Sequence, residues 1–181
     1  GKFAFGAGAP AYIGATEAAF ADFNTFLSHL APGGHNSLSI LGLDSHDAFD
    51  VALYEGVDSD NYEPRVVSQS IDLRNFTSIY LGTASDVILS STVHAPSNGI
   101  LKLTAVDDGL LAIAAPLGSN VTSVEIGFAA GTAAEKFGDG TIEMIAPQTY
   151  AGGTTLHSGT LMLGVSSNLT HDQSAIANGP I

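Results

Sequence analysis

The chain has 181 residues, 45% of them hydrophobic and 13% charged, which is enough apolar material to bury a core and excludes a disordered chain. Eighteen acidic and five basic residues give a net charge of −13, which excludes nucleic acid as a partner because its binding needs clustered Lys and Arg. The lack of cysteine excludes disulfides and thiolate metal sites. No apolar run approaches the roughly 18 residues that span a bilayer, so we expect a soluble segment without membrane insertion.

The first predicted element is a helix that begins at Thr16, its N-cap, and runs to about Leu30. Its apolar residues at helical spacing are Phe20, Phe23, Leu27 and Leu30. Residues 32–34, Pro-Gly-Gly, end the helix. We interpret the apolar stripe as a packing surface rather than as a groove for a partner.

Two strands and a loop follow the helix. Residues 37–43 alternate as a half-buried strand does, and residues 48–54 form a second predicted strand. The acidic stretch 55–63 has the composition of a solvated loop. Residues 1–66 are therefore expected to form a small α/β portion with one helix.

From residue 67 onward the pattern changes to short apolar pairs, each separated by one residue. The pairs are Ile71/Leu73, Ile79/Leu81, Val87/Leu89, Leu101/Leu103, Leu111/Ile113, Val124/Ile126, Ile142/Met144 and Leu161/Leu163. Each pair predicts a strand of three to five residues whose alternate side chains point inward. Turn-forming Gly, Asn, Asp, Ser and Pro separate the pairs.

One phrase repeats along this part of the chain. Gly-Thr-Ile-Glu-Met at residues 140–144 returns as Gly-Thr-Leu-Met-Leu at residues 159–163, nineteen positions later, with looser echoes at 99–103 and 109–113. A period of about twenty residues is typical of one rung of a β-solenoid. An ordinary sandwich also has evenly spaced short strands, but the duplicated phrase favours the solenoid.

Residues 138–144 (Gly-Asp-Gly-Thr-Ile-Glu-Met) and 149–164 (Thr-Tyr-Ala-Gly-Gly-Thr-Thr-Leu-His-Ser-Gly-Thr-Leu-Met-Leu-Gly) closely resemble the autotransporter-associated β-strand repeat. The resemblance covers about residues 136–181 and departs from the family pattern at Ile142 and at residues 147–148. It implies the β-helical passenger region of a large bacterial surface protein that is secreted through the outer membrane. No catalytic role is implied for its residues.

The repeat contains seven positions with an expected architectural role. They are Gly152, Gly153, Thr154, Thr155, Gly159, Leu161 and Leu163. The paired glycines permit positive φ at a sharp corner where a Cβ would clash. The paired threonines suit a strand and can hydrogen-bond along the stack. The two leucines, together with Leu156, are expected to point into the core.

Two acidic clusters are candidates for a metal site. Asp44 and His46 would lie on one face of a strand, but no established ligand spacing surrounds them, so a solvated turn is favoured. Asp58 and Asp60 alternate as in calcium loops, although Glu63 stands where the EF-hand requires glycine. We therefore expect no cofactor and no metal site, with weak calcium binding as the alternative.

Catalysis is not expected either. The carboxylates beyond residue 66 have no consistent register from rung to rung, and the chain has no Gly-x-Ser-x-Gly motif. A β-helical polysaccharide lyase or glycoside hydrolase is the third alternative for function.

The sequence thus predicts a mainly β protein in which a short right-handed parallel β-helix, residues 67–181, is capped by residues 1–66. The preferred function is a non-catalytic structural or adhesin segment of a secreted protein, extracellular or at the bacterial cell surface. Its expected partners are adjacent solenoid repeats of the same polypeptide, with host or matrix glycans as the external candidates. The second alternative is a carbohydrate- or glycoprotein-binding module that binds through residues 1–66.

Overall fold

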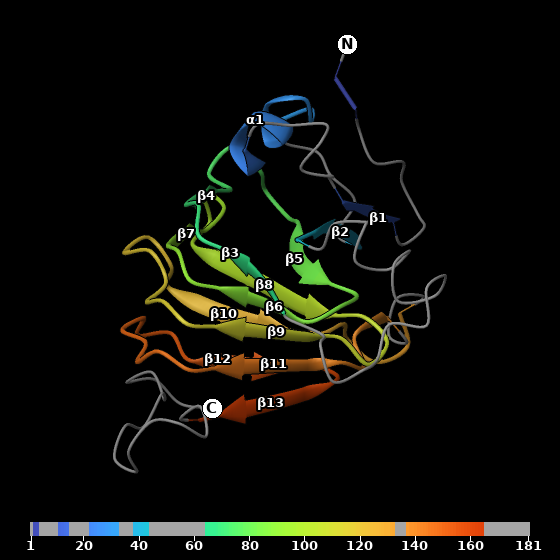
Figure 1. Ribbon diagram of the computed structural model, residues 1–181, viewed down its shortest axis with the longest axis vertical. Coiled ribbons are helices and arrows are strands. Elements are labelled where there is room, and N and C mark those ends of the chain that lie inside the picture. The colour runs from blue at the N-terminus through green and yellow to red at the C-terminus, as the bar shows by residue number, and fades with distance from the viewer. Residues whose placement is uncertain are drawn as a thin grey trace.

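The computed structural model describes residues 2–3, 11–14, 22–32, 38–43, 64–132 and 137–164. Within these ranges the protein has thirteen short strands and a single helix of six residues. The expectation of a mainly β fold with little helix is confirmed, and every strand pairing is parallel (Figure 1).

The strands form three parallel sheets. The first sheet has the order β1 (Ala11–Gly14), β2 (Ser39–Gly42), β5 (Tyr80–Thr83), β8 (Ile100–Ala105), β10 (Ser123–Ile126) and β12 (Thr154–Leu156). The second sheet consists of β3 (Arg65–Val67), β6 (Val87–Leu89), β9 (Leu110–Ile113), β11 (Thr141–Met144) and β13 (Thr160–Leu163). The third sheet pairs β4 (Ile71–Asp72) with β7 (Val93–His94).

From β3 to β8 the chain visits the second, third and first sheets in turn, and from β8 onward it alternates between the first and second sheets. Each return places a strand beside an earlier strand of the same sheet. After β5, β6 and β7 it re-enters the first sheet at β8, where Leu103 pairs with Leu81, 22 residues earlier. The next return pairs Leu101 with Val124, a step of 23 residues. These steps are slightly longer than the predicted period of about twenty, because the turns between strands differ in length.

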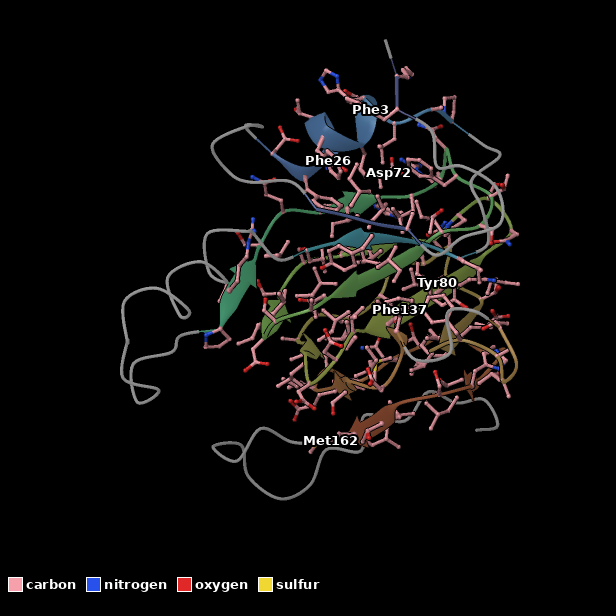
Figure 2. All side chains as sticks on the ribbon, turned by 90° about the vertical axis from the view of Figure 1, so that its right-hand side faces the viewer. Phe3, Phe26, Asp72, Tyr80, Phe137 and Met162 are labelled. Carbon is pink, nitrogen blue, oxygen red and sulfur yellow. The ribbon has the colours of Figure 1, made fainter. Side chains whose placement is uncertain are left out.

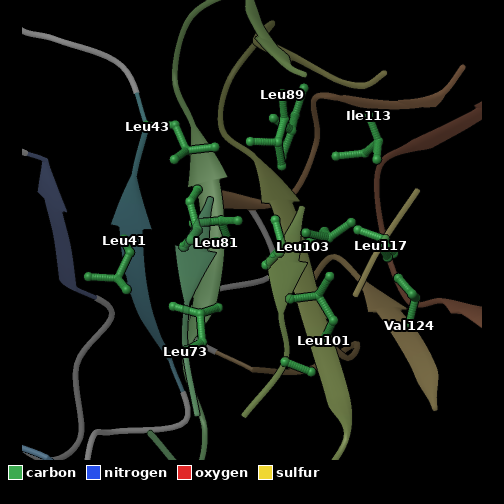
Figure 3. Close-up of a cluster of buried hydrophobic side chains, with 14 of the residues drawn as sticks. Leu41, Leu43, Leu73, Leu81, Leu89, Leu101, Leu103, Ile113, Leu117 and Val124 are labelled. Atoms are coloured by element: carbon green, nitrogen blue, oxygen red, sulfur yellow. The ribbon is translucent and has the colours of Figure 1, made fainter. Parts of the chain in front are cut away.

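Apolar side chains from all three sheets meet in one core (Figure 3). The seven predicted apolar pairs from Ile71 to Met144 lie in it, and each of their side chains is at most 1% exposed. Alternation explains this result, since residues i and i+2 of a strand share a face and only the inner face is enclosed. Burial of this continuous apolar column is the main stabilising contribution to the fold.

The helix α1 (Phe23–Ser28) begins later than predicted. Asp22 is its N-cap, with extended backbone angles and a carboxylate that accepts the N–H of Thr25 at 2.7 Å. An acidic cap satisfies a free N–H of the first helical turn and faces the positive end of the helix dipole. The expected cap, Thr16, lies outside the described residues, and the prediction of a single helix from Thr16 is wrong because Asp22 is not helical.

The helix ends at Ser28, close to the predicted end at about Leu30, and residues 29–31 are held by a parallel pairing. The N–H of Phe3 donates to the carbonyl of His29 at 2.8 Å, and the N–H of Ala31 donates to the carbonyl of Phe3 at 2.7 Å. Leu30 is buried between these bonds, within the main core.

The strand β2 is buried on both faces, so the prediction of a half-buried strand at residues 37–43 is wrong. The inner face contributes Leu41 to the main core, while Ile40 joins a second apolar cluster on the outer face. That cluster contains the rings of Tyr80 and Phe128, whose centroids are 4.2 Å apart. The strand predicted at residues 48–54 lies outside the described residues.

One backbone amide and one side-chain amide extend the pairing where the third sheet has no further strand among the described residues. Gly118 donates its N–H to the carbonyl of Val93, and the Oε1 of Gln148 accepts the N–H of Leu117, both at 2.9 Å. Gln148, one of the departures from the repeat pattern, is buried and also donates to the carbonyl of Ala146. A buried amide that completes backbone hydrogen bonds in this way avoids a desolvation penalty.

Candidate functional site

The duplicated phrase forms adjacent strands in direct register. Thr141 pairs with Thr160 and Met144 pairs with Leu163, so each residue of the first copy lies beside its counterpart in the second. The echo at residues 109–113 pairs with the other side of β11, whereas the echo at residues 99–103 belongs to the first sheet. Three of the four related phrases are therefore neighbours in the second sheet.

The strands β12 and β13 form the edge of the first two sheets opposite β1 and β3 (Figure 1). Leu156 lies in register with Ile126, and Leu163 lies in register with Met144, so both leucines occupy inward positions. Ile126 and Met144 are each 1% exposed, yet Leu156 is 45% and Leu163 is 40% exposed.

The expectation that Leu156 and Leu163 belong to a buried core therefore differs from the structure. No strand in the described part of the chain lies beyond them, and only Leu161 packs partly against the core. Met162 on the outer face is half exposed as well. The result is an apolar, open edge, which we call the β12–β13 edge.

The glycines of the repeat have the two backbone roles expected of them, positive φ and a close backbone approach, but different glycines have different roles. Gly153 has a φ of +84°, and Gly159 has a φ of +79°. Gly152 instead allows the backbone to lie close to that of Thr122, because a Cβ at Gly152 would lie 2.5 Å from the carbonyl oxygen of Thr122. The hydroxyl of Thr154 bonds to the Tyr150 hydroxyl within the same turn and not, as expected, along the stack, while Thr155 is exposed.

A cleft of about 480 Å³ lies at the other end of the molecule. One wall comes from α1 and residues 30–32 and also includes Lys2; the other comes from residues 70–76 and His94. In Figure 2, Asp72 is labelled beside Phe26 and below Phe3, at the same end of the molecule. The cleft therefore lies between the N-terminal portion and the corner that follows β4.

Asn24 fixes the helix to this corner. Its Nδ2 donates to the carbonyl of Ser70 at 2.6 Å, and its Oδ1 accepts the N–H of Asp72 at 3.0 Å. One side chain thus makes two hydrogen bonds, to the backbone just before β4 and to β4 itself, as a neighbouring strand would. It holds α1 at a fixed position above the cleft.

Asp72 and Arg74 form a bidentate ion pair in the cleft. The Nε of Arg74 donates to Oδ1 of Asp72 at 2.9 Å, and Nη2 donates to Oδ2 at 2.6 Å. These hydrogen bonds from Arg74, with a smaller contribution from His94, lower the pKa of Asp72 to about 2. The same pairing raises the pKa of Arg74. Both groups therefore stay charged across the physiological pH range.

The metal candidates Asp44, His46, Asp58 and Asp60 all lie outside the described residues. Within the described ranges, no group of three or more His, Asp or Glu side chains could hold a metal ion. No helix in that same part of the chain is long and apolar enough to span a membrane.

Sequence reasoning missed the cleft because its residues come from distant parts of the chain. Lys2, Asn24 and His94 have no common motif, and their proximity depends on where α1 packs. The one local signal was the Asp-x-Arg spacing of Asp72 and Arg74 directly after an apolar strand residue. Such a spacing is common in surface turns, so it could not identify a site.

Comparisons of the chain with protein-family models, with curated proteins and with solved structures gave no match in any of the three.

Proposed function

We propose that residues 67–181 form a short right-handed parallel β-solenoid capped by residues 1–66, and that it acts as a structural or adhesin segment of a large secreted bacterial surface protein. It carries no catalytic role in this proposal. Parallel neighbours joined by a crossover are right-handed in nearly all proteins, which supports the proposed hand. The resemblance of residues 136–181 to the autotransporter-associated repeat supports the proposed setting.

The β12–β13 edge is the observation that carries this proposal. Two inward leucines at this edge are 45% and 40% exposed, whereas the residues at the same positions of the preceding strands are buried. An edge with free backbone groups and exposed apolar side chains is a site of aggregation unless another strand covers it. Adjacent repeats of the same polypeptide, added in the register of β11 and β13, are the partner that fits this edge.

The opposite end of the sheets supports the capping role of the N-terminal portion. Phe26, Leu27 and Leu30 extend the main core at the side of α1, and Asn24 bonds to the backbone of β4. Caps of this kind are required where a stack of repeats would otherwise expose its core. The core is thus covered by α1 beside β4, while β1 and β3 are the outermost described strands of their sheets at this end.

Introduced cysteines test the architecture, because the natural chain has none. Thr141 and Thr160 pair directly in neighbouring strands, so the double variant Thr141→Cys/Thr160→Cys should form a disulfide on mild oxidation. The control is Thr141→Cys/Met162→Cys, which shifts one partner by two residues to a separation of about 8 Å, beyond disulfide reach. Cross-linking is read from the change in gel mobility with and without reductant. Equal cross-linking of both pairs would contradict the register and with it the solenoid.

Surface labelling tests the proposed setting. Antibodies raised against the 181-residue chain should label intact cells of the bacterium that produces it, and external protease should remove the label. Labelling that requires permeabilised cells would overturn the proposal of a surface segment.

A further inference from the structure

We propose that the cleft between α1 and β4 binds a sugar that carries a carboxylate, with Lys2 and Arg74 at the carboxylate and neighbouring polar side chains at the hydroxyl groups. This inference goes beyond the structural role proposed above and does not depend on it. A stalk segment and a soluble fragment would present the same cleft.

The size of the cleft fits such a ligand. Its volume of about 480 Å³ falls in the range of about 300–1,000 Å³ that is typical of small-molecule sites. The cleft is open to solvent at Arg74, whose side chain is 60% exposed, so a longer saccharide can leave it at that side. One or two sugar rings would lie inside.

The lining favours a polyhydroxylated ligand over an apolar one. Eight of the twelve described lining residues have polar or charged side chains. Asn75, Ser70 and Asp72 offer the donors and acceptors that hydroxyl groups need. Leu27, Leu30 and Phe76 lie beneath them and are largely buried in the main core. The cleft therefore presents a polar surface over an apolar base.

The distribution of charge favours an acidic ligand. The whole chain has five Lys and Arg residues against eighteen Asp and Glu, yet two of the five, Lys2 and Arg74, line this cleft. His94 adds an imidazole, and Asp72 is the only carboxylate among the described lining residues. A molecule with a net charge of −13 repels anions in general, so a local excess of cations marks the place where an anion can bind.

The ion pair prepares Arg74 for this role. Asp72 fixes the guanidinium through Nε and Nη2, which leaves the N–H groups of Nη1 and one of Nη2 for a second acceptor. A guanidinium already held in place loses less side-chain entropy when it binds a carboxylate. The lowered pKa of Asp72 keeps the holding group ionised at any pH where the ligand is charged.

Titration followed by NMR tests the proposal on the full 181-residue chain. The probes are sodium digalacturonate, its methyl ester as the neutral counterpart, and sodium sulfate as an inorganic anion. We expect digalacturonate to shift the amide signals of residues 70–76 and 94, with a Kd on the order of 1 mM, and both other probes to bind at least tenfold more weakly. Equal binding of the ester would overturn the charge argument, and equal binding of sulfate would reduce the cleft to an unspecific anion site. No shift at 20 mM digalacturonate would overturn the proposal as a whole.

Three charge-neutralising variants locate the site. Arg74→Gln and Lys2→Gln should each weaken digalacturonate binding, by about tenfold and about threefold respectively. The matched control is Lys102→Gln, since Lys102 lies away from the cleft, 3.3 Å from Glu125 and over the ring of Tyr80. An equal loss in Lys102→Gln would mean that only net charge matters and would overturn the assignment. Lys2 is exposed, so Lys2→Gln tests the site even if Arg74→Gln disturbs the corner. Failure of either binding test leaves the cross-linking and labelling tests of the structural role unaffected.

Discussion

The two ends of the sheets differ in how far their outermost apolar side chains are exposed to solvent. At the end of α1, Phe26 and Leu30 are 3% and 2% exposed, because the helix and residues 29–31 lie over β4 and beside residue 3. At the other end, Leu156 and Leu163 are inward but half open. The residue types are equally apolar, so exposure here depends on the presence of a covering neighbour and not on sequence.

The backbone shows this difference only at β4, because β1 and β3, like β12 and β13, have a neighbouring strand on one side only within the described residues. Near α1, the amide of Asn24 supplies the hydrogen bonds that a further strand would supply to β4. At the β12–β13 edge, each strand has a neighbouring strand on one side only within the described residues. The comparison teaches that α1 covers the core at the N-terminal end, whereas the inward leucines at the β12–β13 edge are left open.

The largest expected effect comes from a pair of leucines in one inward column. Leu103, Ile126 and Leu156 lie in register on β8, β10 and β12, and Leu103 is fully buried. Leu103→Ala should lower the free energy of unfolding by about 2–5 kcal/mol, because it removes a buried side chain and leaves a cavity. Leu156→Ala should lower it by about 1 kcal/mol or less, since its side chain is already half in water. Urea denaturation measures both.

Similar losses in the two variants would contradict the contrast between interior and edge. A chain extended at its C-terminus by further natural repeats sharpens the same test. There, Leu156→Ala should become more damaging, because the added strands would bury the side chain.

Most strands from residue 71 onward could be predicted from sequence because local alternation and burial agree there, whereas no apolar pair indicated β7. Leu101 and Leu103 read as a strand with one inner face, and the structure encloses that face. The two similar phrases of the nineteen-residue repeat form β11 and β13, which pair in direct register. The fold class follows from such local signals.

The remaining features depend on contacts that the sequence does not encode locally. The double burial of β2 arises because Phe128 and Tyr80 pack on the outer face of the first sheet. The exposure of Leu163 depends on the lack of a further described strand, which its own residue type cannot reveal. The cleft requires α1 to pack against β4, and no periodicity predicts that placement.

The turn before β13 gives the next largest effect. Gly159 has a positive φ of +79°, and a Cβ there would lie 2.5 Å from the carbonyl oxygen of Gly138. Gly159→Ala should lower the free energy of unfolding by about 2–3 kcal/mol, from left-handed strain and steric displacement of the backbone together. The control, Gly131→Ala, shares the φ of +79°, but a Cβ added there would meet no non-neighbouring atom within 4 Å, so only the strain of about 1 kcal/mol remains.

Thermal denaturation monitored by circular dichroism compares these two variants. If Gly131→Ala is as damaging as Gly159→Ala, the close approach of neighbouring turns contributes nothing. In that case the β12–β13 edge is looser than the register of β11 and β13 implies.

The attachment of α1 gives a smaller effect. Asn24→Ala removes both hydrogen bonds to the backbone of residues 70 and 72 and should lower the free energy of unfolding by about 1–2 kcal/mol. It should also speed hydrogen exchange at the amide of Asp72, whose bond to Oδ1 is lost. The matched control is Asn75→Ala, because Asn75 lies in the same cleft and makes no side-chain hydrogen bond within the described part of the chain. If the two variants behave alike, α1 is not anchored through Asn24, and the closed end resembles the open one.

The smallest effect is the acid dependence of the corner after β4. The hydrogen bonds from Arg74 lower the pKa of Asp72 from 3.8 to about 2, so the unfolded chain takes up this proton at a higher pH than the folded one. The resulting stabilisation is fully present above about pH 4 and is lost as the pH falls towards 2. The effect on stability is small because the pair is exposed to solvent and screened. NMR titration of the carboxyl carbon should give a pKa of about 2 for Asp72 and a value close to 3.8 in Arg74→Gln. The pKa of Asp22, lowered by its hydrogen bonds to Thr25, should stay unchanged in that variant, which separates the loss of one ion pair from a general disturbance of the N-terminal end.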